Sequence, residues 1–246
     1  MNKRISVVIP VYNAAGSLSE LYQRLVNVLQ KITDTFEVIM VDDNSQDESY
    51  QQILQLHKKD NRIKGIKLAR NFGQQNALIC GFNYVKGDYI INIDDDLQHS
   101  PEDIIRLYDT IIEGYEVVYG IPVNRKHKFY RKIGSKLTDL LLAWITSKDR
   151  DIRVSSFRIM TGELVEKIID HQTAFVYISA IILQYTDNIN NIFVSHNSRK
   201  YGSSNYNFIK SARLFLKLFI YYGNFSLLKL FRSEKPQYRI EEKIGL

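Results

Sequence analysis

"YIINIDDDLQHSPED", residues 89–103, joins an apolar run to three consecutive aspartates and then to the start of a helix. Residues 89–93 have the length and composition of a short buried strand. Ser100 and Pro101 are typical of the first turn of a helix, which the sequence predicts to end near Gly114. A strand, a polar turn and a helix in this order form the repeating unit of an α/β domain.

The same unit occurs on both sides of this stretch. Apolar runs of strand length recur at residues 5–10, 36–41, 63–68, 115–120 and 155–160. Helices are predicted after the capping-box pairs Ser17–Glu20 and Ser45–Glu48, and over residues 74–87, closed by Gly87. We therefore expect an α/β fold with a Rossmann-like, mostly parallel sheet and helices on both faces.

Composition limits the class of protein. The chain has 246 residues, 45% of them hydrophobic, which suits one large α/β domain with or without an appendage. Its formal net charge of +6 favours anionic partners such as nucleotides or acidic lipids. The single cysteine, Cys80, excludes a disulfide within the chain and suits a reducing compartment. No segment reaches the roughly 18 uncharged apolar residues of a spanning helix, and the first residues lack the features of a signal peptide. We expect a cytoplasmic protein.

Polar residues follow the predicted strands at 11–13, 42–45, 69–73 and 94–98. In open parallel sheets, ligands bind in the crevice outside the carboxyl ends of the strands. These four stretches are therefore expected to meet at one site. Neither G-x-G-x-x-G nor G-x-x-x-x-G-K-[ST] occurs, which argues against a dinucleotide-binding fingerprint and against a P-loop.

The three aspartates are the most distinctive candidates for a site. In extended backbone, Asp94, Asp96 and Gln98 share one side of the chain, with Asp95 turned away. Neighbouring carboxylates stay ionised together when a cation compensates them, and oxygen ligands suit Mg²⁺ or Mn²⁺ that also holds substrate phosphates. The alternative is a solvated loop whose acids cap the following helix. The local pattern leaves both interpretations open, and His99 is expected to be solvated.

Six sequence blocks occur in order: "VVIPVYNA" (7–14), "VIMVDDNSQD" (38–47), "LARNFGQQNAL" (68–78), "GDYIINIDDDLQHSPE" (87–102), "SSFRIM" (155–160) and "SRKYGSSNY" (198–206). Together they resemble the family-two glycosyltransferases of the GT-A fold, and within them the polyprenyl-phosphate hexose synthases of the dolichol-phosphate mannose synthase type. The resemblance favours the metal-site interpretation of the aspartates. It implies a metal-dependent, inverting hexosyltransferase that uses a nucleotide-diphosphate sugar as donor.

The resemblance also implies roles for particular residues. Asp94, Asp96 and Gln98 match the D-x-D-L-Q ligands of a divalent cation, Mg²⁺ or Mn²⁺, and Asp96 matches a catalytic residue. Positions that match contacts to the nucleotide sugar are Pro10, Tyr12, Asp42, Arg70, Asp94, Arg199 and Ser204. Arg199 is also the second implied catalytic residue, in an R-x-x-G-x-S loop that closes over the site. Ala14 stands where the family often has an acid that contacts the nucleotide, so the identity of the base stays open. Asn44 stands where the family often has a glycine, a mild departure because asparagine also tolerates left-handed turns.

The acceptor side matches the family more loosely. Arg125, Arg131 and Ser135 fall where the family grips the acceptor phosphate. Relatives that use a sugar hydroxyl need a carboxylate base, commonly at the start of a helix after the block at 155–160. Residues 171–186 contain no Asp or Glu, and Asp170 just precedes them. A phosphate monoester needs no base because it is mostly ionised at neutral pH.

These observations favour a polyprenyl phosphate, such as undecaprenyl phosphate, as the acceptor. Transfer to a hydroxyl of a lipid-linked oligosaccharide during surface polysaccharide synthesis is the alternative. A non-catalytic module that binds nucleic acid through its basic residues is disfavoured, because Lys and Arg are scattered along the chain and no nucleic-acid motif occurs.

Residues 1–206 are predicted to form the GT-A catalytic domain, with a nucleotide-sugar-binding half (1–120) and an acceptor half (121–206). Residues 207–246 are predicted as an amphipathic C-terminal tail, whose interleaved cations are Lys210, Arg213, Lys217, Lys229 and Arg232. Amphipathic helices with cationic flanks bind anionic membrane surfaces. We therefore expect a peripheral protein on the inner face of the cell membrane. The alternative is a helix pair packed on the core or in a homodimer.

Overall fold

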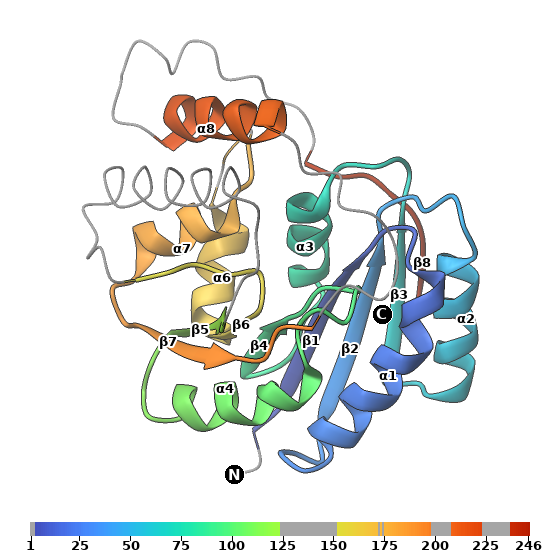
Figure 1. Ribbon diagram of the computed structural model, residues 1–246. Helices are drawn as coiled ribbons and strands as arrows, with labels where there is room; N and C mark the ends of the chain where they lie inside the picture. The colour runs from blue at the N-terminus through green and yellow to red at the C-terminus, as the bar shows by residue number, and fades with distance from the viewer. Residues whose placement is uncertain (1–2, 124–151, 172, 174, 198–207, 223–236) are drawn as a thin grey trace.

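The computed structural model describes residues 3–123, 152–171, 173, 175–197, 208–222 and 237–246 (Figure 1). Within these ranges the elements follow in the order β1 (Ile5–Val11), α1 (Ala15–Leu29), β2 (Phe36–Asp42), α2 (Ser49–Lys59), β3 (Ile63–Leu68), α3 (Gln74–Phe82), β4 (Tyr89–Asn92), the 3₁₀ helix η1 (Pro101–Asp103), α4 (Ile104–Ile111), β5 (Val117–Pro122), β6 (Arg158–Thr161), α6 (Gly162–Asp170), α7 (Ile178–Tyr185), β7 (Ile189–Val194), α8 (Phe208–Tyr222) and β8 (Ile240–Ile244). All the strands predicted from the sequence are present.

The strands form one eight-stranded sheet in the order β7-β5-β6-β4-β1-β2-β3-β8. Its centre, β4-β1-β2-β3, is parallel. β6 runs antiparallel to both β4 and β5, β8 runs antiparallel to β3, and β5 and β7 are parallel to each other. The predicted mostly parallel α/β sheet is confirmed.

Helices cover both faces of the sheet, as predicted (Figure 1). Along β1, Val7 and Ile9 point to the face covered by α1, α2 and α4, whereas Val8 points to the face covered by α3, α6 and α7. Each strand of the parallel centre is therefore apolar on both sides, which is why these runs show little alternation in sequence. α8 packs on this second layer through the buried side chains of Leu218 and Tyr222.

The capping-box predictions for the first two helices are wrong. α1 begins at Ala15, so Ser17 lies inside the helix and donates its hydroxyl hydrogen to the carbonyl of Ala14 at 2.9 Å. α2 begins beyond Ser45, whose hydroxyl accepts a hydrogen bond from the backbone N–H of Asn13 at 2.9 Å. Both serines bond to the β1–α1 turn rather than capping their own helix, an alternative that short polar side chains readily adopt.

One further boundary differs from prediction, because α3 ends at Phe82 instead of continuing to Gly87. Ser100 and Pro101 do stand at the start of η1, as predicted. The hydroxyl of Ser100 does not cap the helix, however: it accepts a hydrogen bond from Arg24 at 2.9 Å and donates to Glu102 at 2.5 Å. The side chain is therefore used in an ion-pair network between α1 and η1.

The C-terminal residues include a strand that the sequence analysis did not predict. β8 pairs with β3 at the edge of the sheet, so the end of the segment 207–246 belongs to the sheet rather than to an amphipathic tail. The strand is short and its sequence, "IEEKI", has charged residues in the middle, as is common for edge strands. Such a sequence does not show the apolar run from which a strand is predicted. In the described part of the chain, no helix is both long and apolar enough to cross a membrane.

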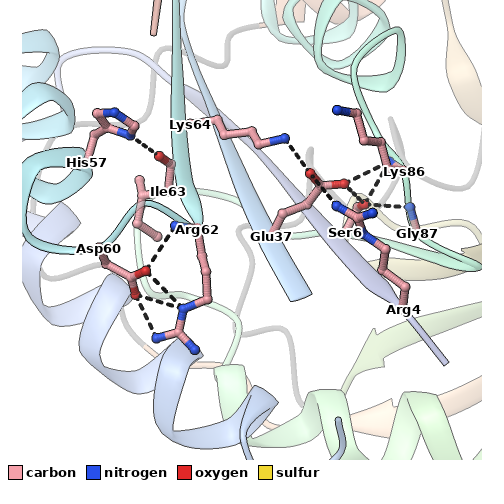
Figure 2. Close-up of polar contacts among 10 residues, drawn as sticks. All are labelled: Arg4, Ser6, Glu37, His57, Asp60, Arg62, Ile63, Lys64, Lys86 and Gly87. Atoms are coloured by element: carbon pink, nitrogen blue, oxygen red, sulfur yellow. Dashed lines mark hydrogen bonds and ion pairs between the residues drawn. The ribbon is translucent and has the colours of Figure 1, made fainter. Parts of the chain in front are cut away.

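A buried polar group lies near the amino ends of β1, β2 and β3 (Figure 2). We call Ser6, Glu37 and Lys64 the Glu37 cluster. Ser6 Oγ donates to Glu37 Oε1 at 2.6 Å, and Lys64 Nζ donates to Glu37 Oε2 at 2.6 Å. The backbone N–H of Lys86 adds a bond to Glu37 Oε1 at 2.7 Å. Gly87 approaches so closely that a Cβ there would lie 2.6 Å from the nitrogen of Ser6.

Candidate functional site

The carboxyl ends of β1, β2 and β4 meet at one edge of the sheet. Val11 at the end of β1 pairs with Asp42 at the end of β2, and the N–H of Asp43 donates to the carbonyl of Val11 at 2.8 Å. On the other side of β1, the N–H of Tyr12 donates to Asp95 Oδ2 at 3.0 Å. The prediction that the polar ends of these strands come together is confirmed by these contacts.

The β1–α1 turn and the β2–α2 turn hold each other in place. Asn13 donates its backbone N–H to Ser45 and accepts, through Oδ1, a bond from the N–H of Gln46 at 2.7 Å. Asn13 and Asn44 both have positive φ, 52° and 59°. Asparagine tolerates this left-handed conformation, so Asn44 fills the place of a glycine.

The aspartates do not lie in extended backbone, so the assumed alternation of their side chains is wrong. β4 ends at Asn92, and Asp95 and Asp96 form a turn. Leu97, which is buried, has a φ of 59°, an uncommon conformation for a leucine and a mark of local strain. Asp96 Oδ1 accepts the backbone N–H of Gln98 at 3.1 Å. The turn forms because these acids bond to backbone groups of their own loop and of β1.

Asp94 is held at both carboxylate oxygens by neutral donors. Gln74, the first residue of α3, donates Nε2–H to Oδ1 at 2.6 Å. Ser156, which precedes β6, donates its hydroxyl to Oδ2 at 2.7 Å. Neutral hydrogen bonds fix the orientation of a carboxylate without cancelling its charge, as the hydrogen-bond partners of metal ligands do. Neither partner was predicted from the sequence, although each lies in a block that carries the family resemblance.

Asp43 anchors the loop between β3 and α3. Its two oxygens accept the N–H groups of Phe72 at 2.6 Å and Gly73 at 2.7 Å. Gly73 has a φ of 90°, which a side chain disfavours. In the first turn of α3, Gln75 Oε1 accepts the N–H of Ile178 at the start of α7. The loop and the first turn of α3 together therefore connect β2, Asp94 and α7, and these positioning residues were not predicted.

Asp42 lies fully buried beside the exposed Tyr12. Asp42 Oδ2 accepts the N–H of Ser45 at 3.1 Å. Asp42 Oδ1 is buried and, within the described residues, has no hydrogen-bond partner. Burial raises the pKa of Asp42, and the bonds from Ser45 only partly oppose this effect. An acceptor in this state suits a ligand that donates a hydrogen bond. Pro10 is buried inside β1.

The other predicted contacts are only partly within the described residues. Arg70 is exposed in the β3–α3 loop, with its guanidinium 4.6 Å from the ring centre of Phe72. The predicted residues that lie outside the described ranges are Arg125, Arg131, Ser135, Arg199 and Ser204.

His99 is buried, so the expectation that it is solvated is wrong. Its ring stacks on Phe157 with 5.0 Å between ring centres. It also forms an isolated antiparallel bridge with His196, whose ring lies 5.5 Å away. This bridge connects the end of the aspartate turn to the segment after β7. The sequence does not reveal it, because the two histidines are far apart in the chain.

On the acceptor side, α7 begins without an acidic residue in its first turn. Asp170 is the last residue of α6 and is exposed. The stretch predicted to lack an acid, residues 171–186, contains the start of α7, whereas α6, which begins directly after the "FRIM" block, carries Glu163 in its first turn. The start of α7 lacks the group that would accept a proton from a hydroxyl nucleophile.

The donor atoms at the end of β4 fit a divalent cation that is only partly enclosed by protein. Among the described residues, no three His, Cys, Asp or Glu side chains come together as a complete set of metal ligands. Asp94 and Asp96 offer hard carboxylate oxygens, and Gln98 offers an amide oxygen nearby in sequence. A few such ligands and several open positions are what Mg²⁺ or Mn²⁺ uses when it also binds a phosphate.

Residues 6–164 match the family described as Glycosyl transferase family 2. The chain is 35% identical, over 217 residues, to an undecaprenyl-phosphate 4-deoxy-4-formamido-L-arabinose transferase of Photorhabdus laumondii, covering 88% of this chain and 67% of that protein. A protein of the same name from Proteus mirabilis is 33% identical over 216 residues, with 87% and 66% covered. The chain thus spans about two thirds of the length of these relatives.

The fold is similar to that of glucosyl-3-phosphoglycerate synthase from Mycobacterium tuberculosis. Its complex with UDP superposes with a TM-score of 0.65 at 16% identity, covering 89% of this chain and 78% of that one. Its complex with Mn²⁺, UDP and glucosyl-3-phosphoglycerate gives a TM-score of 0.66 at 15% identity, covering 97% and 86%. This likeness confirms the predicted GT-A fold. By sequence and by fold, the chain belongs to glycosyl transferase family 2.

Proposed function

We propose that the protein transfers a sugar from a nucleotide-diphosphate sugar to a polyprenyl phosphate. The observation that carries the proposal is Asp94, whose carboxylate is oriented by Gln74 and Ser156 at the edge where the strands end. Ligands of open α/β sheets bind at this edge. The curated relatives named above act, by their names, on an undecaprenyl phosphate.

Each end of the site has a separate task in this proposal. Asp42 and Tyr12, at the ends of β2 and β1, bind the nucleoside of the donor. Asp94, Asp96 and Gln98 hold Mg²⁺ or Mn²⁺. When bound, the cation neutralises charge on the donor diphosphate as it leaves. The acceptor phosphate attacks the anomeric carbon from the opposite side and inverts its configuration.

The acceptor is proposed to be a phosphate because α7 provides no base. A sugar hydroxyl is a weak nucleophile at neutral pH and needs a carboxylate to take its proton. A phosphate monoester has a second pKa of about 6 and already carries the negative charge it needs. The absence of an acid in the first turn of α7 is therefore compatible with a phosphate acceptor and unfavourable for a hydroxyl.

The test is a reconstituted transfer. Purified protein, Mg²⁺ or Mn²⁺ and undecaprenyl phosphate are incubated with a panel of nucleotide sugars, and the lipid product is identified by mass spectrometry. The panel contains hexoses, as the sequence resemblance suggests, and amino-pentoses, because the relatives are named for an arabinose derivative. We expect one donor to yield a sugar-phosphate lipid, and Asp170→Asn to remain largely active.

The competing function predicts a different result. If a donor is consumed only when a lipid-linked saccharide replaces undecaprenyl phosphate, the acceptor is a hydroxyl and the proposal is wrong. A loss of activity in Asp170→Asn, with the wild-type melting temperature, would support the same conclusion by identifying a base. Glu166→Gln, in the middle of α6, is the matched control for a change of one exposed carboxylate.

We further propose that α8 contacts an anionic membrane from the side. One face of α8 packs on the core: Leu218 is buried, and the hydroxyl of Tyr222 donates to the carbonyl of Phe175 at 2.7 Å. The other face exposes Arg213, Leu216 and Lys217. An exposed leucine between cations suits an interfacial helix, and each cation near an anionic surface contributes about 1 kcal/mol.

Flotation with liposomes tests this surface. A truncation at residue 207 is unsuitable, since it would also remove β8 from the sheet. The double variant Arg213→Glu/Lys217→Glu keeps the buried face of α8 and reverses the charge of the other. We expect weaker flotation with phosphatidylglycerol liposomes than for wild type, and no binding of either protein to neutral liposomes. Equal flotation of both proteins would exclude α8 as the contact.

A further inference from the structure

A row of buried polar side chains crosses the sheet directly below Asp94. Arg158 on β6 pairs with Asn92 on β4 and with Tyr119 on β5. We call these three residues the Arg158 row. They point to the face of the sheet that α7 covers, where Arg158 Nη1 donates to the hydroxyl of Ser179 at 3.1 Å. Each of the three is at most 1% exposed.

The hydrogen bonds of this row are incomplete. Within the described residues, the amide oxygen and nitrogen of Asn92 and Nε of Arg158 are buried without a hydrogen-bond partner. Buried polar groups are almost always bonded, because each unpaired group loses its bonds to water. Three unpaired atoms on two adjacent side chains are therefore more than ordinary packing accounts for.

The guanidinium of Arg158 also lacks a compensating charge in contact with it. Among the described side chains, no carboxylate lies within ion-pair distance of Arg158. Burial lowers the pKa of Arg158, and Tyr119, Tyr177 and Asp94 partly oppose this effect. A buried cation without a partner is costly, and an isolated guanidinium keeps its charge because its pKa is so high.

The position of the row indicates what its charge can act on. Two residues beyond the pair Asn92–Arg158, the segments that continue β4 and precede β6 meet again through the Ser156–Asp94 hydrogen bond. Two residues span at most about 7 Å, so Asp94 lies no more than roughly that far beyond the pair Asn92–Arg158. Gln74 of α3, the helix that covers the same face as α7, donates to Asp94, which places Asp94 toward the face of Arg158. Between these levels the interior is protein, in which a charge is screened much less than in water.

We propose that Arg158 is a positioning residue whose buried positive charge favours the diphosphate of the sugar donor at the end of β4. This inference rests on the proposed function, since it assumes that the diphosphate binds beside Asp94. Arg158 does not touch the donor. It supplies a fixed charge that needs no rearrangement when negative charge develops on the leaving group. Asn92 and Tyr119 surround it with polar atoms in place of a carboxylate, which would cancel the charge.

The test compares ligands that differ only in charge. Uridine, UMP and UDP are titrated by NMR, in EDTA, into wild type, Arg158→Met and Arg158→Gln. For one unit charge at roughly 10 Å and an effective dielectric of about 20, we expect about a tenfold loss of UDP affinity in each variant. The loss for UMP should be smaller, and uridine should bind unchanged. Arg106→Met, on α4 at the opposite face, removes the same charge from the surface and should change none of these affinities.

The outcomes separate the possible roles of Arg158. Equal losses for the three ligands would mean that Arg158 only supports the shape of the site, and the inference would be overturned; so would full retention of UDP affinity. If Arg158→Met does not fold, the affinities of Arg158→Gln, which keeps a polar side chain in place of the guanidinium, test the inference without it. Thermal unfolding should show a melting temperature that is unchanged or raised in a folded variant, because a buried charge is removed. Failure of wild type to bind any nucleotide in the donor panel would instead count against the proposed function.

Discussion

The Glu37 cluster and the Arg158 row are two polar groups that cross the same sheet on the same side, near opposite ends of its parallel strands. In the Glu37 cluster, a buried cation, Lys64, meets a carboxylate at 2.6 Å, and hydroxyl and backbone donors fill the remaining positions of Glu37 (Figure 2). In the Arg158 row, a buried cation meets a serine hydroxyl, and neighbouring polar atoms stay unpaired.

The difference shows how stability and function are separated in this domain. Burial alone would raise the pKa of Glu37, but the hydrogen bonds from Lys64, Ser6 and the backbone of Lys86 outweigh burial and lower it. A fully bonded group of this kind makes the structure rigid. A buried polar group with incomplete hydrogen bonds lowers stability, and such groups are commonly found at functional sites. In this chain the incompletely bonded group, the Arg158 row, lies near the carboxyl ends of the parallel strands, where ligands bind.

The largest expected effect is on turnover at the functional end. Asp94→Asn and Asp96→Asn each remove one charged ligand of the proposed cation while keeping the size of the side chain. We expect sugar transfer to fall by about 100- to 1000-fold, as for loss of one transition-state contact. EDTA should inhibit wild type to a similar extent. Circular dichroism melting should stay close to wild type. Full activity of Asp96→Asn in metal-free buffer would contradict the metal site.

The next effect is on stability at the other end. Lys64→Met leaves the buried Glu37 with only the longer ion pair from Arg4, at 3.5 Å. The free energy of unfolding should therefore fall by less than the loss of about 3–5 kcal/mol that is expected for a buried charge with no partner. Glu37→Leu/Lys64→Met removes both charges and should regain most of that loss. Urea unfolding at pH 7 measures both variants. A double variant as unstable as the single one would show that Ser6 and the backbone donors, rather than the ion pair, dominate the cluster.

A smaller effect, on metal binding, is expected from the neutral hydrogen bonds to Asp94, which resemble those that Ser6 and the backbone of Lys86 donate to Glu37. Gln74→Leu and Ser156→Ala each remove one donor to Asp94. Loss of a hydrogen-bond partner of a metal ligand should weaken Mn²⁺ binding by about 10- to 100-fold. Electron paramagnetic resonance of free Mn²⁺ measures this directly, without an assay of transfer. Ser195→Ala, whose hydroxyl bonds to Asp103 on the opposite face, is the control. Unchanged Mn²⁺ binding in both variants would mean that Asp94 needs no support.

The smallest effect, on stability, is expected for the Arg24–Glu102 ion pair near the surface, with which the stability effects of the two buried groups can be compared. The hydrogen bond from Arg24 lowers the pKa of Glu102 to about 2. Its contribution to stability is therefore present above the ordinary pKa of 4.5 and is lost as the pH falls towards 2. Because the side chain of Glu102 is 52% exposed and that of Arg24 is 26% exposed, water screens the pair, and we expect Glu102→Gln to cost less than about 1 kcal/mol at pH 7. Urea unfolding between pH 7 and pH 3.5 should show the difference shrinking; a difference that grows at lower pH would contradict it.

For residues 5–120, the order of strands and helices and the edge at which the site forms could be predicted from the sequence alone. Apolar runs such as 5–10 and 36–41 are long enough to cross a sheet and are too apolar to lie anywhere but inside. Polar residues directly after them must then gather at one edge, because parallel strands all point the same way. Asp94 and Asp42 were predicted for this reason together with the family resemblance.

Only the tertiary structure decided which side chains support those residues. Gln74 reaches Asp94 because α3 starts beside β4, and His99 meets His196 because two distant segments form a bridge. β8 forms a strand because its backbone pairs with β3 at the edge of the sheet, although its own residues do not predict a strand. The Arg158 row arises because β6 inserts antiparallel between β4 and β5, which places three polar residues side by side. The periodicity of one segment indicates only which of its own faces is buried. The contacts between distant segments depend on which strands become neighbours in the sheet, and periodicity does not indicate this.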